Sequence, residues 1–127
     1  MIKSPWRLTQ TIKGLCILLA EENPVNQKLA KRVLENRGHK VFIVNDGYEA
    51  LSAVKEHSEN ISLILMDCQM PTMNGFDATR EIRAMYSESE RRLAIIAMTA
   101  NAMSGDREKC LEVGMDDYLP TVATGAM

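Results

Sequence analysis

The chain has 127 residues, of which 46% are hydrophobic and 25% are charged, and its formal net charge is −2. These values are typical of one globular domain with its own core, and they give no electrostatic footprint for nucleic acid or anionic lipid. No apolar run approaches the roughly 20 residues that span a bilayer, and residues 1–13 lack the apolar core of a secretory signal. We therefore expect a cytoplasmic chain without membrane or nucleic-acid contact.

Apolar runs of strand length alternate with helical patterns along the chain. Strands are predicted at residues 15–20, 40–45, 61–66, 93–99 and 116–120, and helices at 24–37, 46–57, 75–86 and 104–114. Around the first helix, Asn23 suits the N-cap, Pro24 the first helical position and Gly38 the end. The apolar residues of its predicted inward face are Val25, Leu29, Ala30, Val33 and Leu34.

This alternation predicts an α/β fold in which right-handed βαβ units build a parallel sheet with helices on both faces. We assign residues 1–13 to a lead-in or linker, 14–120 to the domain and 121–127 to a tail. The cysteines Cys16, Cys68 and Cys110 are odd in number and far apart, so we expect small apolar side chains at or near the core, without disulfides or zinc.

Polar side chains follow three of the predicted strands. Glu21 and Glu22 follow the first strand, Asp67 the third and Thr99 the fourth, and ligands of such sheets bind at the carboxyl ends of the strands. Two carboxylates about 5 Å apart repel by about 3 kcal/mol, a cost that a divalent cation removes. Oxygen ligands favour magnesium. The alternative is that these residues are solvated strand ends.

Asp67 has two chemical interpretations if the metal site exists. It is a metal ligand only, or it also attacks phosphorus to form an acyl phosphate, with the Thr99 hydroxyl donating to the phosphoryl oxygens. Pro71 and Gly75 predict a tight loop between Asp67 and the next helix.

Four stretches resemble the receiver domain of two-component response regulators, most closely receivers attached to hybrid histidine kinases. They read ILLAEENPVNQKLAKRVLENRGH, NDGYEAL, LILMDCQMPTMNGFDATREIR and IIAMTANAMSGDREKCLEVGMDDYL. The resemblance covers residues 15 to about 119 and implies a three-layer α/β/α, flavodoxin-like fold whose five parallel strands have the order 2-1-3-4-5.

The resemblance also implies roles for individual residues. Asp67 is the phosphoryl acceptor, and Mg²⁺ is held by Glu22, Asp67 and the backbone carbonyl of Gln69, with Glu21 as the acidic neighbour. Thr99 is the switch hydroxyl and Tyr118 the aromatic switch residue of the fifth strand. The phosphoryl group comes from a histidine kinase or a histidine phosphotransfer protein. That partner docks on the first helix, whose exposed face is expected to include Asn26 and Gln27.

Three features depart from the family pattern. Glu22 stands where the family has Asp, and Thr121 stands where it has the lysine that pairs with the acceptor and its phosphoryl group. The stretch 121–127 is too short for the expected fifth helix, which would leave one sheet face partly uncovered and open to self-association. A truncated chain, an aberrant gene product and a degenerate receiver all fit these departures.

Other functions fit the residues less well. A phosphatase of the haloacid dehalogenase type needs a second Asp two residues after the first, and Gln69 stands there. A pseudo-receiver, an interaction module without phosphorylation switching, is favoured by Thr121 but opposed by the intact Asp67, the acidic pair and Thr99. The preferred interpretation is a phosphoacceptor domain in a phosphorelay, not a free-standing enzyme, belonging to a hybrid histidine kinase.

Overall fold

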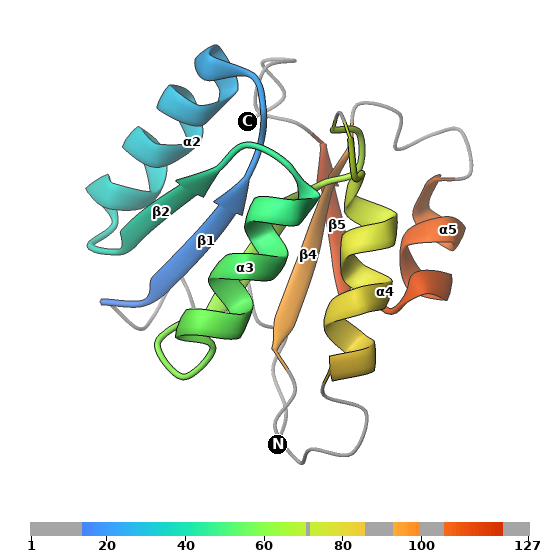
Figure 1. The fold of residues 1–127 in the computed structure, drawn as a ribbon. Coiled ribbons are helices and arrows are strands. Elements are labelled where there is room, and N and C mark those ends of the chain that lie inside the picture. Colours follow the sequence, from blue (N-terminus) through green and yellow to red (C-terminus); the bar gives the residue numbers. More distant parts are fainter. Residues whose placement is uncertain (1–13, 71, 86–92, 100–105, 121–127) are drawn as a thin grey trace, which may run out of the picture.

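The computed structural model describes residues 14–70, 72–85, 93–99 and 106–120 (Figure 1). Strands and helices alternate as predicted. The strands are β1 (Cys16–Ala20), β2 (Lys40–Val44), β3 (Leu63–Asp67), β4 (Ala94–Thr99) and β5 (Asp117–Pro120). The helices are α2 (Pro24–Asn36), α3 (Gly47–His57), α4 (Gly75–Met85) and α5 (Asp106–Val113).

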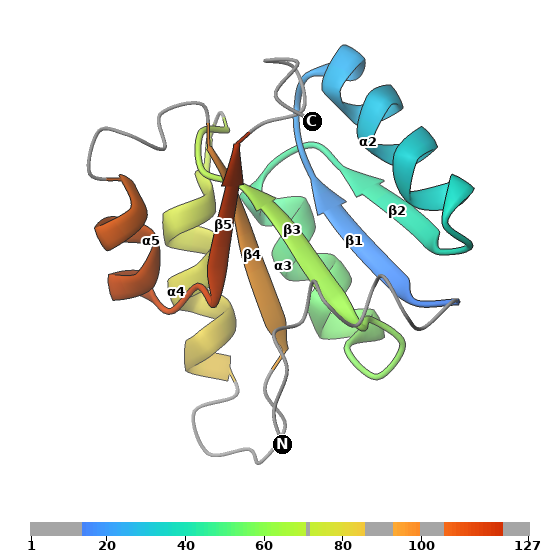
Figure 2. The same ribbon diagram turned by 180° about the vertical axis from the view of Figure 1, so that it is seen from behind.

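The five strands form one parallel sheet in the order β2-β1-β3-β4-β5, which confirms the expected order 2-1-3-4-5 (Figure 2). In the register, Leu19 of β1 pairs with Leu65 of β3, and Leu65 pairs with Ile96 of β4. The central strand β3 is buried along its whole length, as a continuous apolar run predicts for a strand covered on both faces.

Helices cover both faces of the sheet and create two core clusters. On one face, α3, α4 and α5 bury Val54, Ile82 and Cys110 against Leu18 and Ile95. The other face packs α2 against the sheet through its buried Ala30 and half-buried Leu34. Figures 1 and 2 show this three-layer arrangement, with α2 on the opposite side of the sheet from the other described helices.

The inward face of α2 differs from the predicted one. Val25 and Leu29 are 68% and 40% exposed, whereas Asn26 is buried beside Ala30. Asn26 turns inward because its Nδ2 donates a hydrogen bond of 3.2 Å to Oε1 of Glu21. A polar contact at the start of the helix therefore turns part of the apolar stripe toward solvent.

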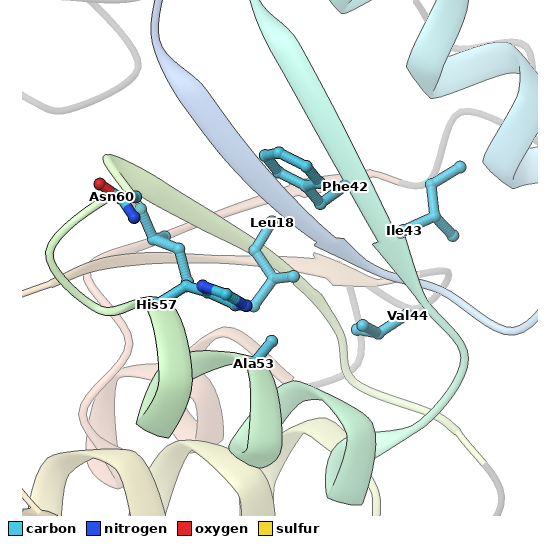
Figure 3. A pocket seen from close by; sticks show the side chains of 8 residues that line it. Leu18, Phe42, Ile43, Val44, Ala53, His57 and Asn60 are labelled. Carbon is cyan, nitrogen blue, oxygen red and sulfur yellow. The ribbon is translucent and has the colours of Figure 1, made fainter.

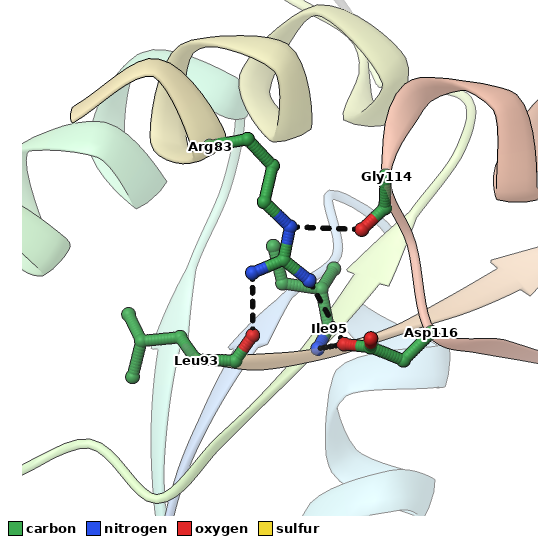
Figure 4. Close-up of polar contacts among 5 residues, drawn as sticks. All are labelled: Arg83, Leu93, Ile95, Gly114 and Asp116. Carbon is green, nitrogen blue, oxygen red and sulfur yellow. Dashed lines mark hydrogen bonds and ion pairs between the residues drawn. The ribbon is translucent and has the colours of Figure 1, made fainter. Parts of the chain in front are cut away.

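A cluster around Arg83 joins α4 to the amino ends of β4 and β5 (Figure 4). The Arg83 guanidinium donates to the carbonyls of Gly114 and Leu93, at 2.8 and 2.7 Å, and to Oδ2 of Asp116 at 2.8 Å. The same Asp116 oxygen accepts from the backbone N–H of Ile95 at 2.9 Å. We call these five residues the Arg83 clasp.

Some expectations concern residues outside the described ranges. The lead-in at 1–13, Pro71 and the tail at 121–127, to which the expectation of a missing last helix refers, all lie there. Among the described residues, no helix is long and apolar enough to span a membrane.

Candidate functional site

Two predicted acidic residues meet at the carboxyl ends of neighbouring strands. Ala20 pairs with Met66 in the β1–β3 register, so Glu21 and Asp67, the residues that follow, lie at the same edge of the sheet. Strand β3 runs one residue further than predicted and includes Asp67 itself. The predicted convergence of these two carboxylates is present in the structure.

Glu21 is held in place by the start of α2. Its side chain is buried, at 2% exposure, and its Oε2 accepts a hydrogen bond of 3.0 Å from the backbone N–H of Asn23. Its Oε1 accepts from Nδ2 of Asn26. Asn23 in turn caps α2 by accepting from the N–H groups of Val25 and Asn26, as its sequence position predicts. Glu22, by contrast, is exposed.

Asp67 lies in an unfavourable environment for an ionised carboxylate. Its pKa is raised from 3.8 to about 7, mainly by burial and further by the charge of Glu21, a hydrogen bond with the Glu21 carboxyl and the charge of Glu22. The backbone N–H of Gln69, which donates to Oδ1 of Asp67 at 3.0 Å, opposes the rise. The site therefore concentrates negative charge that a bound cation would neutralise.

The chain directly after Asp67 is held by backbone hydrogen bonds to β4 and to the start of α4. The N–H of Cys68 donates to the Met98 carbonyl of β4 at 3.0 Å, and the Cys68 carbonyl accepts from the N–H of Gly75 at 3.2 Å. A Cβ at Gly75 would lie 2.2 Å from the Asp67 carbonyl oxygen, so only glycine allows this approach. The predicted loop therefore brings the start of α4 directly against the backbone of Asp67.

A cleft of about 520 Å³ opens beside these residues. Its lining consists of Glu22, Cys68, Gln69, Met70, Asn74, Phe76 and Lys109. Lys109 of α5 lies with its Nζ 4.5 Å from the centre of the Phe76 ring, a cation–π contact. Lys109 had no predicted role, because no local pattern shows that α5 reaches this cleft.

The oxygen donors at this edge fit a magnesium ion. Asp67 and Glu22 could supply carboxylate oxygens, and the cleft, which Glu22 lines, has room for the waters that Mg²⁺ retains. Within the described ranges, no three His, Cys, Asp or Glu side chains form a group that could hold a metal. A site with one or two carboxylates and several waters is compatible with that finding, whereas a closed cage of protein ligands is not.

The remaining predicted site residues fall into two groups. Thr99 ends β4 immediately after Met98, which pairs with Asp67, and Tyr118 lies on β5 opposite Ala97, half-buried against the core. The side chain of Thr99 and all of Thr121 lie outside what the structure describes.

The expected docking face of α2 needs correction. Asn26 is buried, and half-buried Gln27 donates from Nε2 to the Glu21 carbonyl and, at 2.8 Å, to Oδ1 of Asn45. The accessible surface of α2 is instead a shallow groove of about 230 Å³ lined by Val25, Lys28, Leu29 and Arg32. We call these four residues the α2 groove.

A second cavity, of about 330 Å³, lies between α3 and strands β1 and β2 (Figure 3). Apolar side chains such as Leu18, Val44 and Ala53 line it, and His57 and Asn60 are its polar members. None of the clustered carboxylates lines this cavity, so it is separate from the acidic site.

Comparisons with known proteins agree with this geometry. The family model of the response regulator receiver domain matches residues 17–121. Hybrid signal transduction histidine kinase I of Dictyostelium discoideum is 47% identical over 107 residues, and sensor protein GacS of Pseudomonas syringae is 43% identical over 104. Each match covers 81% of this chain but only 6% and 11% of those proteins, so the chain spans a small part of the relatives' length.

Two solved structures are also similar. One is the receiver domain of sensor histidine kinase PA1611 from Pseudomonas aeruginosa, with a magnesium ion coordinated in its active site cleft (48% identity, TM-score 0.74, covering 84% of each chain). The other is the Saccharomyces cerevisiae co-crystal structure of the histidine phosphotransfer protein Ypd1 with the receiver domain of its downstream response regulator Ssk1 (29% identity, TM-score 0.76, 85% of this chain and 79% of that one). The chain belongs to the response regulator receiver domain family, and it is a receiver domain of two-component phosphorelay signalling.

Proposed function

We propose that this receiver accepts a phosphoryl group from a phosphohistidine onto Asp67, at a magnesium site formed with Glu22 and the Gln69 carbonyl. The observation that carries the proposal is the position of Asp67, a carboxylate at the end of the central strand, beside other carboxylates and directly before two residues that line an open cleft. A merely solvated strand end would not be 9% exposed with a pKa raised to about 7.

In the proposed reaction, a carboxylate oxygen of Asp67 attacks phosphorus. The new O–P bond forms as the P–N bond to the donor imidazole breaks, and the imidazole leaves with the bonding pair. The backbone N–H of Gln69 orients the acceptor by holding Oδ1. Bound magnesium would supply positive charge for the acceptor and for the anionic phosphoryl group.

Glu21 keeps the acidic edge in place through its two hydrogen bonds to the start of α2. Thr99 ends the strand next to the acceptor, and we assign its hydroxyl to the phosphoryl oxygens. We assign Tyr118 to the switch that reports phosphorylation. Thr121 cannot supply the ammonium group of the lysine that the family has there, so acceptance and switching are separate questions in this chain.

The α2 groove is the proposed docking site for the phosphohistidine partner. Val25 and Leu29 are exposed apolar side chains on the helix that begins next to the acidic edge, and Lys28 and Arg32 flank them. A partner seated there would bring its histidine near the Asp67 cleft. Relatives that are named as hybrid histidine kinases, and the yeast complex with a phosphotransfer protein, support a histidine kinase or phosphotransfer protein as that partner.

Intact mass after incubation with Mg²⁺ and acetyl phosphate tests the acceptor. We expect the parent chain to gain one phosphoryl group, and Asp67→Asn or a chelator to abolish the gain. Failure of the folded parent chain to gain the group would overturn the proposal and favour the pseudo-receiver. Thr121→Lys would then show whether the lysine is what the site lacks.

A second experiment tests the docking site. Leu29→Glu is expected to slow phosphoryl transfer from a phosphorylated histidine phosphotransfer protein about tenfold, because a charge replaces an apolar contact. Transfer from acetyl phosphate, which needs no docking, should be unchanged. The matched control is Leu111→Glu on α5, also exposed. Equal slowing by both variants would refute the assignment of the α2 groove.

A further inference from the structure

Two cysteines from distant parts of the chain lie side by side next to the acceptor. Cys68 directly follows Asp67, and Cys110 lies in α5. Their sulfur atoms are 3.6 Å apart, and the side chains are 1% and 0% exposed. A disulfide bond is about 2 Å long, so the two sulfurs need to approach by only about 1.6 Å to bond.

The two cysteines lie in different backbone settings. Cys68 is fixed by backbone hydrogen bonds to β4 on one side and to Gly75 on the other. Cys110 belongs to an eight-residue helix, and its carbonyl accepts from the N–H of Met115 at 3.0 Å. Side-chain rotation together with a small shift of α5 is therefore the natural way for the sulfurs to meet.

Cys68 borders a space through which a small reagent could approach. Although its side chain is almost fully covered, it lines the cleft of about 520 Å³ beside the acceptor. Cys16, the third cysteine, lies at the other edge of the sheet, because it opens β1 whereas Cys68 follows the end of β3. Cys16 therefore serves as an internal control, because its oxidation would not involve either of the other two thiols.

We propose that Cys68 and Cys110 form a redox modification site, a thiol pair that closes to a disulfide and ties α5 to the loop after Asp67. With a hydroperoxide as the oxidant, the Cys68 sulfur attacks the terminal peroxide oxygen, the O–O bond breaks, and the departing hydroxide takes the thiol proton as water, which leaves a sulfenic acid. The Cys110 thiol then attacks that sulfur and water leaves. In total, two thiols and one hydrogen peroxide give one disulfide and two waters.

The test is treatment of the folded parent chain with hydrogen peroxide, followed by alkylation in denaturant and peptide mapping. We expect a loss of the mass of two hydrogen atoms, one alkylated thiol out of three, and a linked peptide pair that contains Cys68 and Cys110. Dithiothreitol should restore all three thiols. Cys16→Ser should keep the disulfide, whereas Cys68→Ala and Cys110→Ala should each lose it.

Three results would overturn the proposal. All three thiols remain open to alkylation after peroxide, or the linked peptides contain Cys16, or the loss of two hydrogens persists in Cys110→Ala. Because mapping of the parent chain reads the bond directly, the first two results do not depend on how well the variants fold. The disulfide test does not involve phosphorylation. If Asp67 proved not to be the phosphoryl acceptor, the proposal of a Cys68–Cys110 disulfide would therefore be unaffected.

Discussion

Charged side chains are paired with opposite charges at the amino edge of the sheet but not at its carboxyl edge. At the amino edge, the Arg83 clasp places one guanidinium among two carbonyls and a carboxylate, and Asp116 also accepts from a backbone N–H. At the carboxyl edge, Asp67 lies with Glu21 and Glu22, and among the described residues no lysine or arginine forms an ion pair with any of the three.

This difference separates a stabilising cluster from a functional one. A partly buried charge whose hydrogen-bonding groups are satisfied holds its elements together, whereas clustered carboxylates oppose folding when they are ionised. The acidic edge is tolerable because the rest of the fold holds it in place. In the proposed function, its uncompensated charge would attract a cation and, with that cation, an anionic phosphoryl group.

Breaking the Arg83 clasp should have the largest effect on stability. Arg83→Ala removes the ion pair with Asp116 and the hydrogen bonds to two backbone carbonyls, and the paired side chains are only 17% and 22% exposed. We expect a loss of about 3 kcal/mol in the free energy of unfolding. Urea unfolding followed by circular dichroism measures it.

The matched control for the clasp is Arg80→Ala on the same helix. Arg80 pairs with Asp77 at 2.8 Å, but both side chains are more than half exposed. Its removal should cost less than about 1 kcal/mol. Equal losses from the two variants would mean that the clasp contributes no more than a surface ion pair.

Removing the charge of Asp67 should stabilise the metal-free protein. Folding raises the pKa of Asp67 from 3.8 to about 7, so at low pH the folded state holds this side chain in its neutral form. As the pH rises toward and through 7, Asp67 ionises in the folded state and its contribution to the free energy of unfolding is lost. A pKa shift of this size changes the free energy of unfolding by at most about 4 kcal/mol. Because the surroundings relax around the ionised group, we expect Asp67→Asn to raise the free energy of unfolding at pH 8 by about 2 kcal/mol.

The pH dependence makes this prediction specific. In a chelator, the stability difference between Asp67→Asn and the parent should be large at pH 8 and shrink toward pH 4, as measured by thermal unfolding. Magnesium should raise the Tm of the parent at pH 8 more than that of the variant. Glu81→Gln, at an exposed carboxylate of α4, should be neutral throughout. A constant difference from pH 4 to pH 8 would contradict the link to ionisation.

The sequence predicts contacts well where they follow from strand order and poorly where they depend on packing. The meeting of Glu21 and Asp67 was predictable, because residues that end adjacent parallel strands lie at one edge. The burial of Asn26 was not, because the hydrophobic pattern of α2 does not include its hydrogen bond to Glu21. The nearness of Cys68 and Cys110 depends on how α5 packs, which no local pattern encodes.

The smallest predicted effect concerns the one cation among the described residues that line the cleft. Lys109 is held over Phe76 at the cleft, where an anionic phosphoryl donor would approach. Lys109→Gln should slow phosphorylation by acetyl phosphate about twofold, equivalent to roughly 0.5 kcal/mol, as expected for an exposed charge. High salt should remove the difference, because screening weakens the same attraction.

Lys28→Gln, which removes an exposed lysine of α2, is the control. Equal slowing by both variants would assign the effect to net charge, whereas slowing by Lys109→Gln alone would make α5 a contributor of the positive charge that Thr121 cannot provide.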